Sequence, residues 1–530
     1  MHHGSDQLRL IRIASKPARV LGCLVLSLPL PRKRIRGDKA EVIDLGGRNP
    51  KLSLRSKYVW PLGLECRMRS RRVARKIQFV MGAVVLWASV TPVLGDLTPL
   101  SVSRNHRYLQ DIAGHSFFLV GDSPQNLPLK LAVPEFDPFM AECEERGFNL
   151  LWICIDGQRN GSGTPTTPPP RDRAGHLMMA NGWDIGTLND AYFVTIDAIL
   201  STAQRHGVYC MLTPLSECQW TQDNINRNTS EKWRPYGFYL GQRYKNQANI
   251  LWQFGNDNFN EKAQHAMVQG IKEAGDTHLM TVNWRPGYHQ LGSSWVRKHE
   301  HGESWIDLDA WYRNGPIRDG AAPCYWQKIE YERPDPMPSF QTEAAYQQPD
   351  GGANERANAS DLYCRMQNYY VALGGGCGGH VYGAGWLADA WDYDSYKNNG
   401  GRFQAIHFKN LFVARDWTTL VPDYSHVFIT TGYGTLSPKT MDYVGAAINP
   451  SGTLGIAYCP KAAMITADLS KFSGPVRARW YDPTNGHFGF ADIKGSPFPN
   501  AGRQQFTTPG VNIAGCEDWV LVLETAHDSK

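Results

Sequence analysis

Residues 249–258, NILWQFGNDN, join a strongly apolar run to a polar end. Ile250 to Phe254 suit a buried strand, whereas Gly255 is followed by an amide, an acid and a second amide. In a barrel of parallel strands, the side chains just past the carboxyl end of each strand face a shared active-site rim. We therefore expect Asn256 and Asp257 to project into a site at that end of a parallel sheet.

Similar apolar runs recur along the chain and alternate with helical patterns. The other runs are FFLVG (117–121), NLLWICI (149–155), GVYCMLT (207–213), LMTVNW (279–284), SWIDL (304–308), PSFQTE (338–343) and GHVYG (379–383). Residues 134–146 and 191–206 have helical spacing, and each segment ends at a glycine. Continuous apolar strands separated by helices indicate a parallel sheet. Eight such units in roughly 300 residues predict an α/β fold, a (β/α)8 TIM barrel, over 96–422.

After about residue 425 the pattern changes to short strands with frequent turn signals. These runs are VFITTGYG, YVGAAIN, LGIAYCP, AMITADL, VRARWYDP, GHFGFADI, QQFTTPG and DWVLVLE. They predict a small all-β sandwich over 423–530.

A second acidic residue occupies a position equivalent to that of Asp257. Glu343 ends the seventh predicted strand, in SFQTEAAYQ. Two carboxylates on one rim suit glycoside hydrolysis, because one protonates the leaving oxygen while the other attacks the anomeric carbon or activates water. Either carboxylate alone could instead be a surface acid or a helix N-cap.

Several segments together resemble a known family. They are FFLVGDSPQNL (117–127), ERGFNLLWI (145–153), RYKNQANILWQFGNDN (243–258), NWRPGYH (283–289), SFQTEAAYQ (339–347) and RWYDPTNG (479–486). In their order and spacing over about 100–525, the chain resembles glycoside hydrolase family 140. These are apiosidase-like barrels followed by a small sandwich named for collagen binding. The resemblance implies a retaining hydrolase with Asp257 as acid/base and Glu343 as nucleophile.

The chain departs from that family's pattern at two positions. Ser123 stands where Thr is usual, and Asn256 stands where the family often has Gly. Asn256 resembles the Asn that precedes the acid/base residue in the wider clan, where it holds the sugar 2-hydroxyl. The resemblance to the wider clan therefore implies a substrate-binding role for Asn256, and the departure from the family's pattern argues against apiose itself as the substrate.

Other residues near the predicted strand ends are candidates for substrate binding. Asp122 follows the first strand and could bind a sugar or cap a helix, and Asp156 follows the second. The aromatic candidates could stack on a sugar ring or pack in the core. The remaining candidates are Trp220, Trp284, Tyr288, His289, Trp305, Asp307 and Trp386.

The amino-terminal segment predicts export. Residues 68–95 carry a basic start, MRSRRVARK, and an apolar stretch, IQFVMGAVVLWASV, as a signal peptide does. We expect a secreted or periplasmic protein without an integral membrane span in its mature form. Residues 1–67 precede this signal, and we interpret them as a misassigned extension.

Net charge and sequence motifs exclude several kinds of binding partner and cofactor. Residues 96–530 contain 36 Lys and Arg against 45 Asp and Glu, a net charge of −9 that disfavours nucleic-acid binding. His299 to Glu303 lacks the closing histidine of a zinc-protease motif, and the glycine run 374–379 precedes a strand instead of following one. We expect a carbohydrate partner, no metal and no cofactor; the oligomeric state is left open.

Three functions fit these features to different degrees. The first is a secreted retaining glycosidase acting on a plant or algal polysaccharide or oligosaccharide. The second is a non-catalytic carbohydrate- or matrix-binding protein on a barrel scaffold, which the two rim carboxylates disfavour. The third, a collagen-active hydrolase, lacks a zinc motif or nucleophile triad. We therefore expect the first.

Overall fold

The computed structural model describes residues 97–157, 169–216, 222–256, 260–284, 292–315, 320–347, 360–383, 398–489 and 492–526. The predicted extension and signal peptide lie outside these residues. Within the described part of the chain, no helix has both the length and the apolar character needed to cross a membrane.

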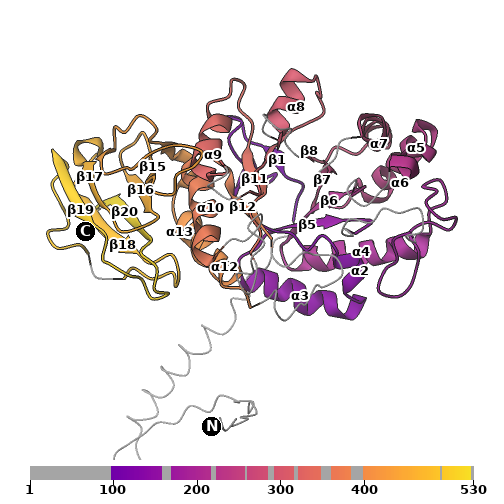
Figure 1. Cartoon of the computed structure of the whole chain (residues 1–530), viewed down its shortest axis with the longest axis horizontal. Helices are drawn as coiled ribbons and strands as arrows, with labels where there is room; N and C mark the ends of the chain where they lie inside the picture. Colours follow the sequence, from indigo (N-terminus) through magenta and orange to yellow (C-terminus); the bar gives the residue numbers. More distant parts are fainter. Residues whose placement is uncertain are drawn as a thin grey trace, which may run out of the picture. The chain divides into compact units, whose positions relative to one another are not determined.

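Eight parallel strands form the predicted barrel (Figure 1). They are β4 (Leu119–Asp122), β5 (Leu150–Cys154), β6 (Tyr209–Thr213), β7 (Ile250–Gly255), β8 (Met280–Asn283), β10 (Asp309–Tyr312), β11 (Ser339–Glu343) and β12 (Gly378–Tyr382). β12 pairs with β4, and the short β9 (Gly292–Ser293) runs antiparallel beside β10. Between β8 and β10, Ser294 Oγ lies 3.0 Å from the carbonyl oxygens of Val282 and Ala310. This side chain links the two strands where the nearly closed sheet has no ladder.

Helices cover the outside of the barrel (Figure 1). The longer ones are α3 (Val133–Glu145), α4 (Asp190–Arg205), α6 (Ser230–Tyr244), α7 (Glu261–Glu273), α8 (Ser294–Glu300), α9 (Pro323–Tyr331), α10 (Asp361–Leu373) and α13 (Ala405–Val413). The shorter ones are α2 (Leu127–Lys130), α5 (Gln222–Arg227) and α12 (Gly400–Phe403). The helices predicted at 134–146 and 191–206 are confirmed as α3 and α4.

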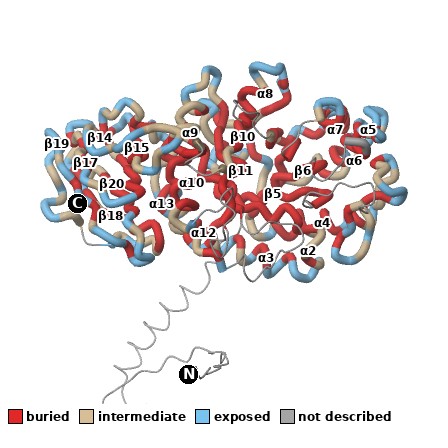
Figure 2. The backbone as a smooth tube through the Cα atoms, in the orientation of Figure 1, coloured by how far each residue is buried: buried red, intermediate tan, exposed pale blue. Residues whose placement is uncertain are grey.

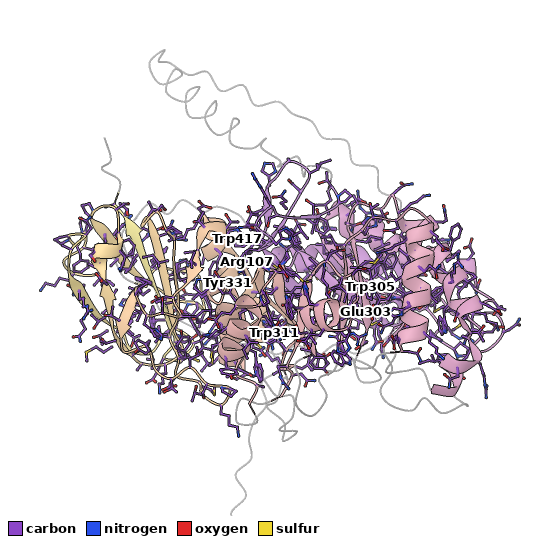
Figure 3. The ribbon with its side chains drawn as sticks, turned by 90° about the horizontal axis from the view of Figure 1, so that it is seen from above. Arg107, Glu303, Trp305, Trp311, Tyr331 and Trp417 are labelled. Carbon is purple, nitrogen blue, oxygen red and sulfur yellow. The ribbon has the colours of Figure 1, made fainter. Side chains whose placement is uncertain are left out.

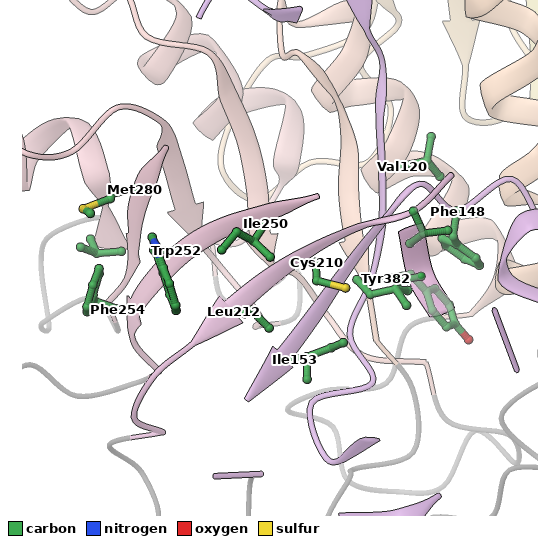
Figure 4. Close-up of a cluster of buried hydrophobic side chains, with 14 of the residues drawn as sticks. Val120, Phe148, Ile153, Cys210, Leu212, Ile250, Trp252, Phe254, Met280 and Tyr382 are labelled. Atoms are coloured by element: carbon green, nitrogen blue, oxygen red, sulfur yellow. The ribbon is translucent and has the colours of Figure 1, made fainter. Parts of the chain in front are cut away.

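The strands are buried on both faces, as the continuous apolar runs predicted (Figure 2). Ile153, Cys210, Leu212 and Trp252 belong to the large apolar cluster that includes the surrounding helices (Figure 4). Alternate residues of the same strands form a second cluster that fills the barrel interior; it includes Leu150, Trp152, Tyr209, Met211 and Leu251. Three short strands precede the barrel: β1 (Ser101–Val102), β2 (Leu109–Gln110) and β3 (Ser116–Phe117). Leu109 of β2 belongs to the interior cluster.

The sixth barrel strand lies later than predicted. Residues 304–308 form a turn and an irregular segment, and the strand begins at Asp309. The apolar run continues from Trp305 to Tyr312, so hydrophobicity alone did not mark which half pairs with β11. Trp305 and Ile306 pack in the outer cluster, whereas Leu308 enters the barrel interior.

The carboxyl-terminal strands form two antiparallel sheets. One has the order β13 (Val421–Pro422), β15 (Gly445–Ile448), β16 (Leu454–Cys459), β20 (Trp519–Thr525) and β18 (Val476–Tyr481). The other has the order β14 (Ile429–Thr431), β17 (Met464–Asp468) and β19 (Arg503–Thr507). Their shared core includes Phe428, Ile465, Phe506 and Leu521, so the predicted sandwich is confirmed.

One segment predicted as a strand in the sandwich, 486–493, forms no regular strand in its described residues. The described residues of 486–493 contain only an isolated bridge between Tyr481 and Phe488. Gly486, with a φ of 76°, ends a turn in which its amide donates to the Asp482 carbonyl at 3.1 Å, and the Phe488 ring packs 5.2 Å from the Tyr481 ring. The amides of Gly489 and Ile493 donate to the Trp480 and Ala478 carbonyls of β18 at 3.1 and 2.9 Å, so the segment is attached to that strand without forming a regular ladder in its described residues.

Candidate active site

Glu343 is held at the carboxyl end of β11. Its side chain is 1% exposed, and Asn314 Nδ2 donates a hydrogen bond to its Oε1 at 3.3 Å. The same Asn314 nitrogen lies 3.1 Å from the hydroxyl of Tyr312, the last residue of β10. The amide nitrogen of Arg313 donates to the Glu343 carbonyl at 3.0 Å. The loop after β10 therefore fixes both the backbone and the carboxylate of Glu343.

A hydrogen bond across the barrel interior connects the seventh strand to the fourth. Thr342 Oγ1 donates to Gln253 Oε1 at 3.2 Å, although β11 and β7 are not neighbours in the sheet. Gln253 Nε2 in turn donates to Thr213 Oγ1 at 3.3 Å. Thr342 directly precedes Glu343, and Gln253 lies three residues before Asn256. The ends of these two strands therefore meet at one rim.

Asn256 continues from β7 in an unusual backbone conformation. Gly255 and Asn256 have φ values of 99° and 83°, in the left-handed region that Asn tolerates better than most residues. The Asn256 side chain is buried, and its Nδ2 donates to Ser216 Oγ at 2.9 Å and to Gln125 Oε1 at 3.1 Å. The same nitrogen lies 3.5 Å from Cys154 Sγ. The loops after β4 and β6, together with the last residue of β5, thus orient this amide.

Asp257 itself lies outside the described residues, as do Trp220, Tyr288, His289 and Trp386. Asp257 directly follows Asn256 in the chain. The roles of these five residues remain predictions.

Asp122 and Asp156 are both fully buried at the carboxyl end of the barrel. Asp156 Oδ1 and Oδ2 each accept a hydrogen bond from the amide of Ser216 at 3.0 Å, so this carboxylate ties the loop after β5 to the loop after β6. Asp122 Oδ2 lies 3.0 Å from the guanidinium of Arg402, which also pairs with Glu142. The N-cap alternative for Asp122 is wrong, because Asn126 precedes α2.

Two residues predicted near the rim after strand six lie elsewhere, because that strand starts later than predicted. Asp307 precedes β10, and its Oδ2 accepts from the amide of Met280, the first residue of β8, at 3.0 Å. It therefore lies at the amino end of the barrel, where burial raises its pKa above the usual value. Trp305 packs edge-on against Phe254 at 5.3 Å and donates to Glu303 Oε2 at 2.7 Å (Figure 3). Its contacts are those of a packing residue.

Trp284 does stand at the end of a strand, directly after β8, and is half-buried. The Arg297 guanidinium lies 5.3 Å from the Trp284 ring, and the His301 ring meets it edge-on at 6.1 Å. These contacts fix the indole at the rim, and its contact with a sugar remains a prediction.

The barrel and the sandwich each match a known family. Residues 103–419, more than half of the chain, match the family described as "Apiosidase-like, catalytic domain". The chain belongs to the apiosidase-like family. This membership places it among glycoside hydrolases. Residues 435–524 match a second family, described as "Putative collagen-binding domain of a collagenase".

Solved structures share the two-domain fold of this apiosidase-like protein. A glycoside hydrolase with 21% identity has a TM-score of 0.67 over 82% of this chain and 98% of its own. A glycoside hydrolase family 5 protein from Bacteroides vulgatus ATCC 8482, with 22% identity, has a TM-score of 0.66 over 81% of this chain and 94% of its own. Comparison with curated protein sequences gives no match.

The sequence analysis did not predict several residues that shape the apiosidase-like rim. Asn314 follows β10 as Asn256 follows β7, in an apolar run that ends in polar residues. The early placement of the sixth strand hid this signal. Ser216 and Gln125 contact Asn256 from other loops, and no local pattern marks them. In the part of the chain that the structure describes, no three His, Cys, Asp or Glu side chains are grouped closely enough to hold a metal ion.

Proposed function

We propose that the chain is a secreted, retaining glycoside hydrolase of family 140 that acts on a plant or algal polysaccharide or oligosaccharide. Glu343 attacks the anomeric carbon while Asp257 protonates the leaving oxygen, which forms a glycosyl–enzyme ester. Asp257 then removes a proton from water, which attacks the same carbon and releases Glu343. Asn256 binds the sugar beside the bond that breaks.

The observation that carries this proposal is the bond between Thr342 and Gln253. It brings the end of β11, with Glu343, to the same rim as the end of β7, after which Asp257 follows. Asn314 holds one oxygen of Glu343, as the orientation of a nucleophile requires. Retention further requires the two carboxyl groups to lie about 5–5.5 Å apart, which a crystal structure of the rim would test.

The first test replaces the two carboxylates in the chain beginning at residue 96. A panel of pectic, algal and aryl-glycoside substrates identifies a cleaved bond. On that substrate we expect Glu343→Gln to lose activity by about 10³-fold or more. Glu145→Gln, an exposed position on α3, is the matched control and should retain full turnover.

The Asp257→Ala variant separates the acid/base role of Asp257 from the nucleophilic role of Glu343. Without an acid, hydrolysis of unactivated glycosides should nearly stop, while aryl glycosides with good leaving groups should still form the ester, since they need no protonation. Proton NMR of the first product should show the anomeric configuration of the substrate. Wild-type turnover by Glu343→Gln would refute the proposal. Sugar binding by the native enzyme without turnover of any substrate would favour the binding protein instead.

A further inference from the structure

A cavity of about 500 Å³ lies at the amino end of the barrel, away from the rim that carries Glu343. Phe118 and Gly376, which line it, lie just before β4 and β12, so the cavity opens where these parallel strands start. Its other walls come from 105–108 and 417–421, with 450–451 of the sandwich. The volume is within the range of small-molecule sites.

Arg107 supplies the positive charge of this cavity. Its guanidinium lies 4.2 Å from the centre of the Tyr331 ring, and its Nη1 donates to the Tyr331 carbonyl at 2.9 Å (Figure 3). Among the described residues that line the cavity none is acidic, and no ion pair engages Arg107 there. Partial burial lowers the pKa of Arg107, and Tyr331 only partly opposes this effect. A ligand carboxylate would supply the missing counter-charge in a bidentate geometry.

Aromatic side chains form the walls beside Arg107. Trp417 meets Tyr108 edge-on at 5.8 Å and Phe118 at 4.9 Å (Figure 3). Trp417 and Tyr108 are half-buried, so part of each remains accessible, whereas Phe118 is buried at the base. Gly375, at a φ of 91°, completes the base, and a Cβ there would lie 2.2 Å from Tyr331. Flat apolar rings beside a cation suit a ring-shaped, carboxylated ligand.

Polar groups complete the surroundings. Asn105 Oδ1 accepts from Ser103 Oγ at 2.8 Å and from the Arg107 amide at 3.1 Å, which fixes the side-chain amide at the cavity wall. The hydroxyl groups of Thr418 and Thr419 also line the cavity; they donate to Asp416 at 3.0 and 2.8 Å, so they offer acceptor lone pairs to a ligand. These donors and acceptors match the hydroxyl groups of a sugar ring.

We propose that this cavity binds a uronic acid residue of an acidic polysaccharide, with the carboxylate on Arg107 and the ring against the Trp417 wall. The choice of a saccharide among carboxylated ligands rests on the proposed function; the anion site itself does not. Because the cavity lies at the opposite end of the barrel from Glu343, a residue bound there is not the one cleaved. Instead, it tethers the enzyme to its polymer and raises the local concentration of cleavable bonds.

Calorimetric titration of the Glu343→Gln protein tests this proposal, because that variant keeps the cavity and does not hydrolyse the probe. The probes are a galacturonic acid trisaccharide, the neutral galactose trisaccharide, acetate and inorganic phosphate. We expect only the acidic trisaccharide to bind well. We expect Arg107→Leu or Trp417→Ala to weaken this binding by at least about tenfold. Arg104→Leu, an exposed position on the same hairpin, should leave it unchanged.

Four results would overturn the inference: no binding, equal binding of the neutral trisaccharide, equal competition by acetate or phosphate, or an unchanged affinity in Arg107→Leu. Thermal melting establishes that each variant is folded, and Arg107→Lys, which keeps the charge without the planar fork, should bind with intermediate affinity. Binding without any hydrolysis by the wild-type protein would count against the proposed function alone.

Discussion

Asn256 combines two properties that conflict in most side chains. Its backbone adopts a φ of 83°, a conformation that Gly adopts without steric cost. Its side chain must also present an amide to Ser216, Gln125 and Cys154. Asparagine resolves the conflict because its short polar side chain tolerates the left-handed region. Strained backbone of this kind persists where the surrounding structure fixes it, often beside functional groups.

Substitutions at Asn256 should therefore separate backbone strain from side-chain bonding. Asn256→Ala loses the amide and keeps the φ requirement, so we expect it to lower the free energy of unfolding by about 2–4 kcal/mol. Asn256→Gly also loses the amide but relieves the strain, so it should be more stable than the alanine variant by about 1 kcal/mol. Chemical denaturation measures both values. Equal stabilities would show that the left-handed conformation is not retained.

Asp309 ties three elements together near the amino end of the barrel. The Ser293 hydroxyl in β9 lies 3.1 Å from Asp309 Oδ1 and 2.9 Å from Glu330 Oε2 in α9, and the amide of Trp295 donates to Asp309 at 3.0 Å. Burial, followed by the nearby Glu330 carboxylate, raises the pKa of Asp309 well above its usual value. The folded protein therefore holds a proton that the unfolded chain releases at lower pH.

The raised pKa of Asp309 determines how its contribution to the free energy of unfolding changes with pH. As the pH rises above about 4, the unfolded chain loses the Asp309 proton first, so the contribution of this residue to the free energy of unfolding falls until the folded pKa is passed. In Asp309→Asn this contribution is absent. We expect the difference in melting temperature between variant and wild type to shift in favour of the variant from about pH 4 to 8. A pH-independent difference would contradict the raised pKa.

Helices α6 and α7 approach each other through glycines. A Cβ at Gly270 would lie 2.0 Å from the carbonyl oxygen of Arg234, and one at Gly237 would lie 2.1 Å from that of Met267. Alanine normally stabilises a helix relative to glycine by about 1 kcal/mol. At Gly270 the added methyl group would collide with the backbone of α6, which cannot move aside as a side chain can. We therefore expect Gly270→Ala to lower the free energy of unfolding by about 1–3 kcal/mol. Gly315→Ala, where a Cβ meets nothing closer than 3.8 Å, should be near neutral in the same thermal melts.

The strands of the barrel were largely predictable because each is an apolar run bounded by helical spacing and glycines. The sixth was misplaced because apolar residues are spread along all nine residues of SWIDLDAWY, whereas only the last four pair with β11. Contacts between distant residues left no local signal at all. The pair of Arg402 and Asp122 joins positions 280 residues apart, and Asn314 reaches Glu343 only because β10 and β11 are adjacent. Long-range partners of this kind become visible only once the strand order is known.

At the scale of the whole barrel and sandwich, one face of the five-stranded sheet packs on helices of the barrel. The rings of Tyr458 in β16 and Tyr369 in α10 stack 4.7 Å apart, and the Tyr481 hydroxyl donates to the His407 carbonyl at 2.8 Å. Arg365 of α10 donates two hydrogen bonds to Asp518 at 2.7 Å, and both side chains are buried. These contacts join the two domains into one packed core, a structural role for the sandwich that requires no ligand.

Removing one partner of the buried ion pair tests this coupling. Asp518→Ala leaves the Arg365 guanidinium buried without its carboxylate, so we expect a loss of about 3–5 kcal/mol in the free energy of unfolding. Since both domains share this core, calorimetry of the chain from residue 96 should show a single transition that moves down as a unit. Arg477→Ala, which breaks an exposed pair with Asp492 inside the sandwich, should change stability by less than about 1 kcal/mol. Two separate transitions, with only the sandwich affected by Asp518→Ala, would show instead that the barrel folds independently.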